Sequence, residues 1–340
     1  MTGNFRYVVT LLLVLLGAPS RAQEYNFRNY LVLGVETAEE LASLYLEPLS
    51  EGLLYGLTGA WNNSAKVKKP WELDVSIVAN GSFVPNEKLS KNVDISAIEN
   101  LEVLGGADRV EIPTILGNEE SEVTFIATLN GEEFIFDAPT GIGLFSTNLL
   151  PNAFFQASLG LPLNSEFSLR VFPKIEVSGA NLGIIGFGLK HELTETIRSI
   201  RNWPFHISVF GAFTRLDADY SFQAEGFITG ESQQVDIYLN SWNLEALIST
   251  KFPVWNVYGG LGYVNGDSNY ALLGTYTIVT EQEVLNFTDP FDVQGQISGI
   301  KANLGTSVRL KRFKVNLDYT FQGFNNLAFG INYKLLKARN

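Results

Sequence analysis

The alternation of apolar and polar positions is clearest at the C-terminal end of the chain, over residues 300–335. The segment 313–321, for example, reads Phe-Lys-Val-Asn-Leu-Asp-Tyr-Thr-Phe. A side-chain period of two predicts β-strands that have one apolar and one polar face. Only Lys311 and Arg312 separate the first two of the three segments, and residues 322–326 separate the last two. The sequence therefore predicts a tight antiparallel meander.

The same alternation recurs through most of the chain before this meander. Strands are predicted at 71–80, 153–161, 167–177, 182–191, 204–215, 236–252 and 255–264. With the last three they make ten, and ribbons inside the long connections would raise the number to 12 or 14. Strands of about ten residues with an apolar outer face suit a bilayer, which offers no partner to an unpaired backbone group. The predicted fold class is all-β, a transmembrane antiparallel up-and-down β-barrel of 10–14 strands with an N-terminal helical plug or hatch.

The connections separate into short and long ones. Residues 81–152 and 265–295 are polar, acidic excursions, and 217–234 is a third polar loop. Within the first, Asn130-Gly131 is a two-residue turn signal that predicts a small β-ribbon from 123–129 and 133–136. The joints at 162–166, 252–253 and 311–312 are short, and a helix is expected in 192–203. Since outer-membrane barrels have short periplasmic turns and long outer loops, we expect the long excursions to be extracellular.

Residues 23–70 precede the barrel, residues 71–340, and are predicted to be helical. Thr37-Ala38-Glu39-Glu40 has the pattern of a capping box, and Pro48 is expected to end the first helix. A second apolar run, 49–61, would complete a helical hairpin. The pattern leaves open whether this segment packs at the periplasmic mouth or fills the lumen as a hatch. We expect residues 23–61 to plug or cap the periplasmic side.

The first 22 residues are typical of a signal peptide. Arg6 precedes an uncharged apolar stretch, and Ser20-Arg21-Ala22 is a small-x-small site, so cleavage is predicted after Ala22. The chain has no Cys, which excludes a disulfide framework and a cysteine-linked lipid anchor. No later stretch reaches the roughly 18 continuous apolar residues of a helical span. These features predict an exported protein located in the outer membrane of a Gram-negative bacterium.

The charge balance argues against a nucleic-acid partner. The formal net charge is −12, and removal of Arg6 and Arg21 with the signal peptide leaves 22 basic against 36 acidic residues. Binding to phosphate backbones requires a basic surface, so no nucleic acid is expected.

Candidate catalytic chemistry is sparse. His191 and His206 are the only histidines, and without Cys a histidine-cysteine metal cluster is excluded. Ser208 follows His206 by two residues on the same predicted face, but a titratable residue on a strand is more often structural. We therefore expect no enzyme activity, no metal and no cofactor.

Charged residues of both signs occupy the inward face of the predicted strands, among them Lys314 and Lys334. The candidates for lining the lumen are Glu72, Asp74, Arg170, Lys174, Glu245, Lys301, Arg309 and Asp318. They would form either a self-neutralising network that fills a narrow lumen or a polar path for a solute.

Several motifs resemble those of a known family. They are the stretches at 45–49 and 59–66, the pair 160–163 and 170–173, and the stretch 186–191. These resemble a family of uncharacterised outer-membrane proteins with a domain of unknown function, which is distantly similar to long-chain fatty-acid porins. The resemblance implies a barrel with an N-terminal plug and passage of a hydrophobic compound.

Three functions follow as expectations. The first is passive transport of a small hydrophobic solute, and the second is a non-transporting cell-surface or envelope protein that binds a partner through its acidic loops. A soluble periplasmic β-sandwich is the third. The expected partners are outer-membrane lipid, a hydrophobic small molecule and the barrel-assembly machinery, for which Tyr333 would serve as the C-terminal aromatic signal. A lumen closed by side chains throughout would favour the second function over the first.

Overall fold

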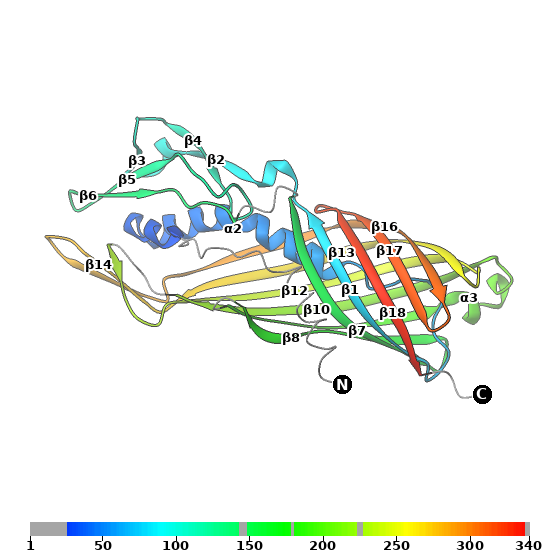
Figure 1. Cartoon of the computed structure of the whole chain (residues 1–340). Coiled ribbons are helices and arrows are strands. Elements are labelled where there is room, and N and C mark those ends of the chain that lie inside the picture. The colour runs from blue at the N-terminus through cyan, green and yellow to red at the C-terminus, as the bar shows by residue number, and fades with distance from the viewer. Residues whose placement is uncertain (1–25, 143–147, 178–179, 223–226, 337–340) are drawn as a thin grey trace.

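The computed structural model describes residues 26–142, 148–177, 180–222 and 227–336. The predicted signal peptide and its cleavage site lie outside these residues. Ten antiparallel strands close into one barrel, as the sequence predicted (Figure 1). They are β1 (Leu73–Phe83), β7 (Leu149–Leu161), β8 (Ser165–Val177), β9 (Ala180–Glu192), β10 (Phe205–Ser221), β12 (Gln234–Thr250), β13 (Trp255–Leu273), β16 (Phe291–Leu310), β17 (Phe313–Phe321) and β18 (Asn326–Leu336). Strand β1 closes the barrel by pairing with both β18 and β7.

The two ends of the barrel differ. At the short-turn end the strands are joined by residues 162–164, 193–204, 251–254 and 311–312, of which the second includes the short helices α3 (Leu193–Thr196) and η4 (Arg198–Ile200). At the long-loop end, the described residues of 84–148, 222–233 and 274–290 form three small sheets that we together call the platform (Figure 1). Its elements are η2 (Asn86–Lys88), β2 (Ser90–Asp94), η3 (Ile95–Ala97), β3 (Leu101–Val103), β4 (Arg109–Pro113), β5 (Thr124–Leu129), β6 (Glu132–Asp137), β11 (Ile228–Thr229), β14 (Thr275–Val279) and β15 (Val284–Thr288).

The Asn130-Gly131 turn is confirmed. These two residues join β5 to β6, and both have positive φ, 53° and 82°. A two-residue turn with positive φ at both positions matches the twist of the flanking strands, which is why Asn-Gly is favoured there.

The outside of the barrel carries an apolar belt. Trp71, Trp203 and Trp255 are exposed near the short-turn end. Between the ends the exposed side chains are mainly aliphatic or Phe, for example Ile185, Phe187, Leu189, Leu244, Leu261, Ile300, Leu304, Leu317, Phe329 and Ile331. Strand β17 has nine residues, and at about 3.3 Å per residue and a tilt of about 40° it covers roughly 23 Å. That height matches the apolar band of about 25 Å on outer-membrane barrels.

The N-terminal segment differs from the predicted hairpin. The 3-10 helix η1 (Asn26–Leu33) leads into one continuous helix, α2 (Val35–Thr58), which enters the barrel from the long-loop end (Figure 1). Residues 59–72, which we call the seal, continue to β1 at the short-turn end. No helix among the described residues is long and apolar enough to cross a membrane.

Two local predictions for this helix are wrong. Pro48 lies inside α2 rather than at its end, and it is buried. The helix tolerates a proline there because tertiary packing on both sides of it outweighs one missing backbone hydrogen bond. The helix also begins at Val35, after Gly34, without a side-chain cap, so Thr37 is in the first turn and does not cap it.

The predicted loops are shorter than expected because several strands are longer. β13 runs to Leu273, β16 begins at Phe291 and β10 extends to Ser221, which shortens the excursions predicted at 265–295 and 217–234. Beyond the apolar belt the outward side chains are polar, as in the hydrogen bond of 2.6 Å from Asn269 Nδ2 to Asp292 Oδ2. The apolar-polar alternation therefore disappears although the strand continues.

Candidate functional site in the closed lumen

Helix α2 occupies the lumen and packs against its wall. It contacts the barrel strands β1, β7, β10, β12, β13 and β16. Leu54 and Leu57 are fully buried in this contact. Their apolar partners on the wall are Val78, Phe154, Phe172, Ile184, Leu216, Leu239, Val264 and Ile297. The part of the lumen toward the long-loop end, which we call the upper part, is thus filled by apolar packing.

The C-terminal turn of α2 ends against polar side chains of the wall. Four carbonyl oxygens at the end of a helix have no partner within the helix, and that end carries partial negative charge. Here each of the last four carbonyls accepts a hydrogen bond from the barrel. Gln322 donates to Tyr55 O (3.2 Å), Asn80 to Gly56 O (2.8 Å), Arg170 and Thr214 to Leu57 O (3.3 and 3.4 Å), and Lys301 to Thr58 O (2.8 Å). Two of these donors, Arg170 and Lys301, are cations, which complement the helix dipole.

Arg170 is the most connected of these side chains and is completely buried. Besides Leu57 O, its Nη1 donates to Gly59 O at 3.0 Å, while Nε and Nη2 both donate to Gln156 Oε1 at 3.2 and 3.0 Å. The guanidinium carbon lies 4.0 Å from the ring centroid of Trp61 and 4.3 Å from that of Phe154. Arg170 therefore joins the helix end, the seal and β7 through both hydrogen bonds and cation–π contacts.

A buried ion pair stands on another part of the wall. Lys301 Nζ lies 2.8 Å from Glu245 Oε1, and both side chains are almost completely buried. Asp318 is buried too and accepts hydrogen bonds from Asn303 Nδ2 (2.8 Å) and Thr320 Oγ1 (3.2 Å). Glu245, Lys301 and Asp318 are thus paired or hydrogen-bonded, as burial of charge requires.

The seal fills the part of the lumen toward the short-turn end, which we call the lower part, and it is held there by polar contacts. The backbone of the seal donates hydrogen bonds to, and accepts them from, side chains on several strands. Helix α2, which precedes it, packs against the wall mainly through apolar groups. Gln156 Nε2 donates to Trp61 O (3.1 Å), Ser307 Oγ to Asn63 O (3.3 Å) and Lys190 Nζ to Ser64 O (3.2 Å), while Ala65 N donates to Ser249 Oγ (3.1 Å) and Val67 N to Glu192 Oε2 (2.9 Å). Asn63 Nδ2 also donates to Asn332 Oδ1 (2.8 Å), and Ser208 Oγ donates to Ala65 O.

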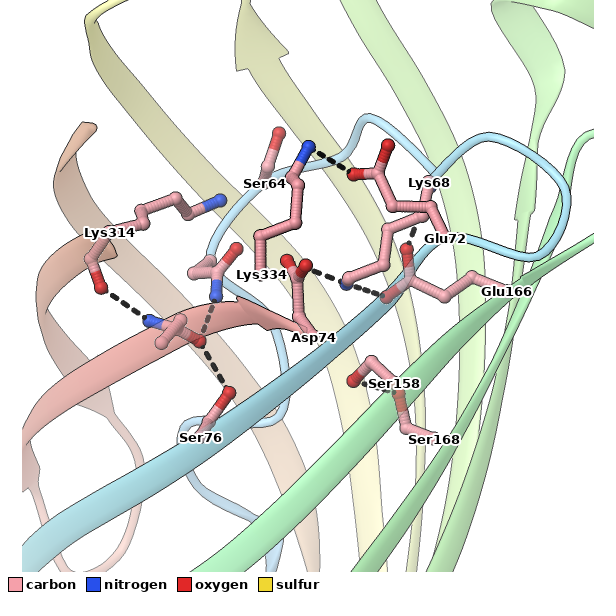
Figure 2. Close-up of polar contacts among 12 residues, drawn as sticks. Ser64, Lys68, Glu72, Asp74, Ser76, Ser158, Glu166, Ser168, Lys314 and Lys334 are labelled. Atoms are coloured by element: carbon pink, nitrogen blue, oxygen red, sulfur yellow. Dashed lines mark hydrogen bonds and ion pairs between the residues drawn. The ribbon is translucent and has the colours of Figure 1, made fainter. Parts of the chain in front are cut away.

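Glu166 joins the seal to the wall near the short-turn end. Its carboxylate lies 3.0 Å from Lys68 Nζ (Figure 2). It also lies 3.2 Å from Lys190 Nζ and accepts a hydrogen bond from Lys68 N. Asp74 Oδ2 lies 3.8 Å from the same Lys68 ammonium. Burial alone would lower the pKa of Lys68, but the nearby carboxylates of Glu166 and Asp74 outweigh it and raise that pKa above 10.5.

The structure places seven of the eight predicted lumen residues inside the barrel or at its mouth. Arg170, Glu245, Lys301 and Asp318 lie in the buried wall. Glu72, Asp74 and Arg309 line a cavity of ≈ 350 Å³ at the short-turn end. The sequence did not single out Glu166, Lys190 or Lys68. Lys190 lies on the strand predicted at 182–191, whereas Glu166 was assigned to the joint at 162–166 and Lys68 to the N-terminal segment.

The prediction for Lys174 is wrong. Its side chain is 61 % exposed and forms an ion pair of 2.8 Å with Asp219 on the outer face. The register of β8 against β9 shifts between Phe172 and Ile175, so two residues of β8 stand opposite Gly183. A β-bulge of this kind reverses which side chains face inward beyond it.

The two histidines have separate structural partners. His206 Nδ1 lies 2.5 Å from Glu192 Oε1, while Ser208 Oγ donates to the seal backbone rather than to the imidazole. His191 is hydrogen-bonded to Ser165 Oγ and Thr196 Oγ1, each at 3.0 Å. Among the described residues no group of three or more His, Cys, Asp or Glu is arranged to hold a metal ion.

Comparisons with known proteins give a family. The model of a family of unknown function, DUF6588, matches residues 1–335, which confirms the resemblance found in the sequence. No curated protein matches the chain.

Solved structures of outer-membrane barrels are similar at low identity. They include Ail of Yersinia pestis (9 % identity, 78 % of this chain and 99 % of that chain, TM-score 0.26). A Pseudomonas aeruginosa FadL homologue (10 %, 87 % and 98 %, TM-score 0.23) and the P. putida toluene transporter TodX (9 %, 82 % and 95 %, TM-score 0.18) are two others. These TM-scores are too low to indicate a function for this chain, so its function is inferred from its own residues.

Proposed function

We propose that this chain, which belongs to the family of unknown function DUF6588, is an outer-membrane barrel that is closed at rest and acts at the cell surface through its platform. The apolar belt supports the membrane location, and the short turns opposite the long loops support an extracellular platform. In this proposal the chain has no enzymatic role, and α2 serves as the rigid support of the platform.

One observation carries the proposal. The same helix that fills the lumen also forms the base of the platform. In its first half Leu41 and Tyr45 belong to a hydrophobic core with Phe125 and Phe136 of the platform, and in its second half Leu54 packs against the barrel wall. A helix of 24 residues is about 36 Å long, which is enough to reach both. Opening the lumen would therefore also unpack the platform.

Direct contacts tie α2 to the platform. Ile115 N donates to Tyr45 O at 3.1 Å, and Tyr45 OH donates to Thr140 O at 2.7 Å. Lys88 and Lys91 of the platform form ion pairs with Glu47 of the helix at 3.4 and 2.6 Å. A surface layer fixed in this way is pre-organised, which lowers the entropy lost on binding a partner.

The charge of the platform indicates what kind of partner it would bind. Its largest part, residues 84–148, contains twelve Asp or Glu against three Lys or Arg. Such a surface attracts a basic partner and repels an acidic one, and the attraction weakens with salt.

Conductance measurements test the closed state. Purified protein inserted into planar bilayers should give no steady conductance, and replacing residues 84–148 by a short turn should leave it non-conducting. A variant that lacks residues 26–70 should conduct, because the lumen loses both α2 and the part of the seal that is hydrogen-bonded to the wall. A steady open channel in the wild-type protein would contradict the proposal.

A second candidate function is the passage of a small hydrophobic solute. It is favoured by the wall residues that face α2, which are largely apolar, such as Phe154, Phe172 and Leu239. If α2 withdrew, the space it left would be about 10 Å wide and lined by these side chains. This function requires that α2 moves.

A reversible cross-link separates the two functions. A Cβ atom at Gly295 of β16 would lie 3.5 Å from Cβ of Ser50 in α2, which is within the range for a disulfide. The chain has no native Cys to interfere. In the double variant Ser50→Cys/Gly295→Cys, oxidation should leave uptake of a hydrophobic reporter unchanged if the barrel stays closed. Uptake that falls on oxidation and returns on reduction, with both single variants unaffected, would establish transport instead.

A further inference from the structure

The cavity at the short-turn end is strongly basic in an otherwise acidic chain. Its lining includes seven basic side chains and only two acidic ones, Glu72 and Asp74, while the chain as a whole has a net charge of −12. The basic residues are Lys66, Lys68, Lys69, Lys251, Arg309, Lys314 and Lys334. They come from the seal, the β12–β13 turn and strands β16, β17 and β18, so the fold brings them together from distant parts of the sequence.

Four of these cations have no partner among the residues that the structure describes. Among the described residues, no hydrogen bond or ion pair reaches the side-chain nitrogens of Lys66, Lys69, Arg309 or Lys314. In Figure 2 no dashed line reaches the Lys314 ammonium, whereas dashed lines mark the ion pairs of Lys68 and Lys334. The two carboxylates of the cavity are already engaged, Glu72 with Lys334 at 2.5 Å and Asp74 with Lys68 at 3.8 Å.

Such an arrangement is costly without an anion. Like charges gathered in one cavity repel each other, and the repulsion is stronger where the wall of the barrel excludes water. A bound anion that accepts from several of them removes this repulsion and gains charge-assisted hydrogen bonds. Lys66, Lys69, Lys251 and Arg309 are exposed at the rim, whereas Lys314 is partly buried, so a ligand can enter from the short-turn end and reach Lys314.

We propose that this cavity is a binding site for a phosphate-bearing anion, held between the seal and strands β16 and β17 by Arg309, Lys314 and the seal lysines. Its volume suits a small phosphate ester or a lipid head group. Phe252 and Val254, exposed apolar side chains on the lining, lie at the same end as Trp255 of the belt. The phosphate therefore has two sources, a soluble compound or an anionic phospholipid of the adjacent leaflet. The site does not depend on whether the lumen conducts.

The first test is isothermal titration of the full-length protein in non-ionic detergent with inorganic pyrophosphate. The double variant Arg309→Gln/Lys314→Gln should bind at least about tenfold more weakly than the wild type. The matched control is Arg198→Gln/Lys311→Gln, which removes the same charge at the same end from two exposed residues outside the cavity. The affinity of this control for pyrophosphate should stay within about twofold of that of the wild type, because the two charges it removes are distant from the cavity and screened by salt.

The second test asks about lipid. In vesicles of phosphatidylcholine with phosphatidylglycerol, a spin-labelled phosphatidylglycerol should be enriched next to the wild-type protein, and pyrophosphate should displace it if the site takes a head group. Pyrophosphate binding without lipid enrichment would identify a soluble ligand of the same chemistry. Folding of each variant is checked by heat-modifiable migration, and Arg309→Gln alone, a change of an exposed side chain, provides a second variant with the same expected direction. The proposal is overturned if neither probe binds, or if the control variant loses as much affinity as the cavity variant.

Discussion

The N-terminal segment has two halves that are held in different ways. In the upper half, η1 and the first turns of α2 lie in the hydrophobic core of the platform, where Tyr30 packs at 6.1 Å, ring centroid to centroid, from both Phe125 and Phe136. In the lower half, the last turn of α2 and the seal are held by hydrogen bonds and ion pairs around Arg170 and Glu166. The upper half is held by buried area and the lower half by directed contacts.

The difference indicates what each half contributes. Apolar burial is non-directional and stabilises in proportion to its area, so the upper half supplies most of the free energy that keeps the segment inside the barrel. The attraction within a buried ion pair is little larger than the free energy lost when both charges are removed from water. Buried ion pairs do fix position, because each requires one partner at one distance. We infer that the lower half sets the depth of the helix in the lumen, and that any loosening of the seal starts there.

Removing the central contact of the lower half should have the largest effect. Arg170→Ala leaves Gly59 O and Gln156 Oε1 without their Arg170 donor, and leaves Leu57 O with only Thr214, in a completely buried place. The free energy of unfolding should fall by about 4 kcal/mol. Urea unfolding in vesicles, followed by tryptophan fluorescence, measures it. The control Arg215→Ala, an exposed arginine paired with Asp217 on the same barrel, should cost less than about 1 kcal/mol. Equal losses would mean that the buried contacts do not hold the helix end.

A cavity in the upper half of the N-terminal segment should reduce the free energy of unfolding by a smaller amount, and its effect should appear in the platform rather than in the barrel. Leu41→Ala removes a buried side chain from the core shared by α2 and the platform. We expect a loss of about 3 kcal/mol. It should appear as faster proteolysis within residues 84–148, while heat-modifiable migration of the barrel persists. Leu104→Ala, an exposed platform residue, is the control and should leave the proteolysis rate unchanged. Cleavage in the seal rather than in the platform would contradict the division into two halves.

Variants of the buried ion pair between Lys301 and Glu245 compare the loss of one partner with the replacement of both. Lys301→Met leaves Glu245 as a buried carboxylate without its counter-ion, and Thr58 O without a donor. The expected loss is about 2 kcal/mol. Adding Glu245→Gln removes the stranded charge, so the double variant should be more stable than Lys301→Met alone. The same urea unfolding measures both. If the double variant is the less stable of the two, the pair is not the reason for the loss.

The comparison also explains what the sequence could reveal. The barrel was predictable because the belt imposes a period of two on nearly every strand, and hydrocarbon enforces it residue by residue. The lumen candidates followed from the same period, and the structure buries the side chains of Arg170, Glu245, Lys301 and Asp318. Lys174 is exposed instead, because a bulge next to Pro173 shifts the register and nothing in a two-residue period reveals it.

The plug was predictable in kind but not in place. The apolar runs around residues 41–57 indicate helix, but contacts far apart in sequence decide that it is one helix inside the lumen. Pro48 illustrates the limit, since a local rule ends the helix where tertiary packing continues it. The basic cavity was hidden for the same reason: Lys68, Arg309 and Lys314 are close only after the barrel has closed around the seal.

The smallest expected effect is on the junction between α2 and the platform, and it depends on pH. Glu47 accepts from Lys91 at 2.6 Å and Lys88 at 3.4 Å. Partial burial would raise the pKa of Glu47, but the hydrogen bonds and charges of these lysines outweigh it and hold that pKa below 4.5. Burial would likewise lower the pKa of Lys88, but its hydrogen bond and charge contact with Glu51, with a smaller share from Glu47, outweigh burial and raise it above 10.5.

The sign of the pH dependence follows from these two directions. A lowered carboxyl pKa gives stability that is complete above pH 4.5 and is lost as the pH falls through the folded-state pKa, and a raised lysine pKa gives stability that is lost only above pH 10.5. The junction should therefore be strongest between about pH 5 and pH 10 and weaken in acid. Since these groups are partly exposed, the effect is screened to about 0.5 kcal/mol, or roughly a twofold faster proteolysis of the platform below pH 4. Glu47→Gln should show the faster rate already at pH 7 and lose this part of the acid response. Glu39→Gln, an exposed change on the same helix, should behave as the wild type, and an acid response that survives in Glu47→Gln would assign it to other carboxylates of the platform.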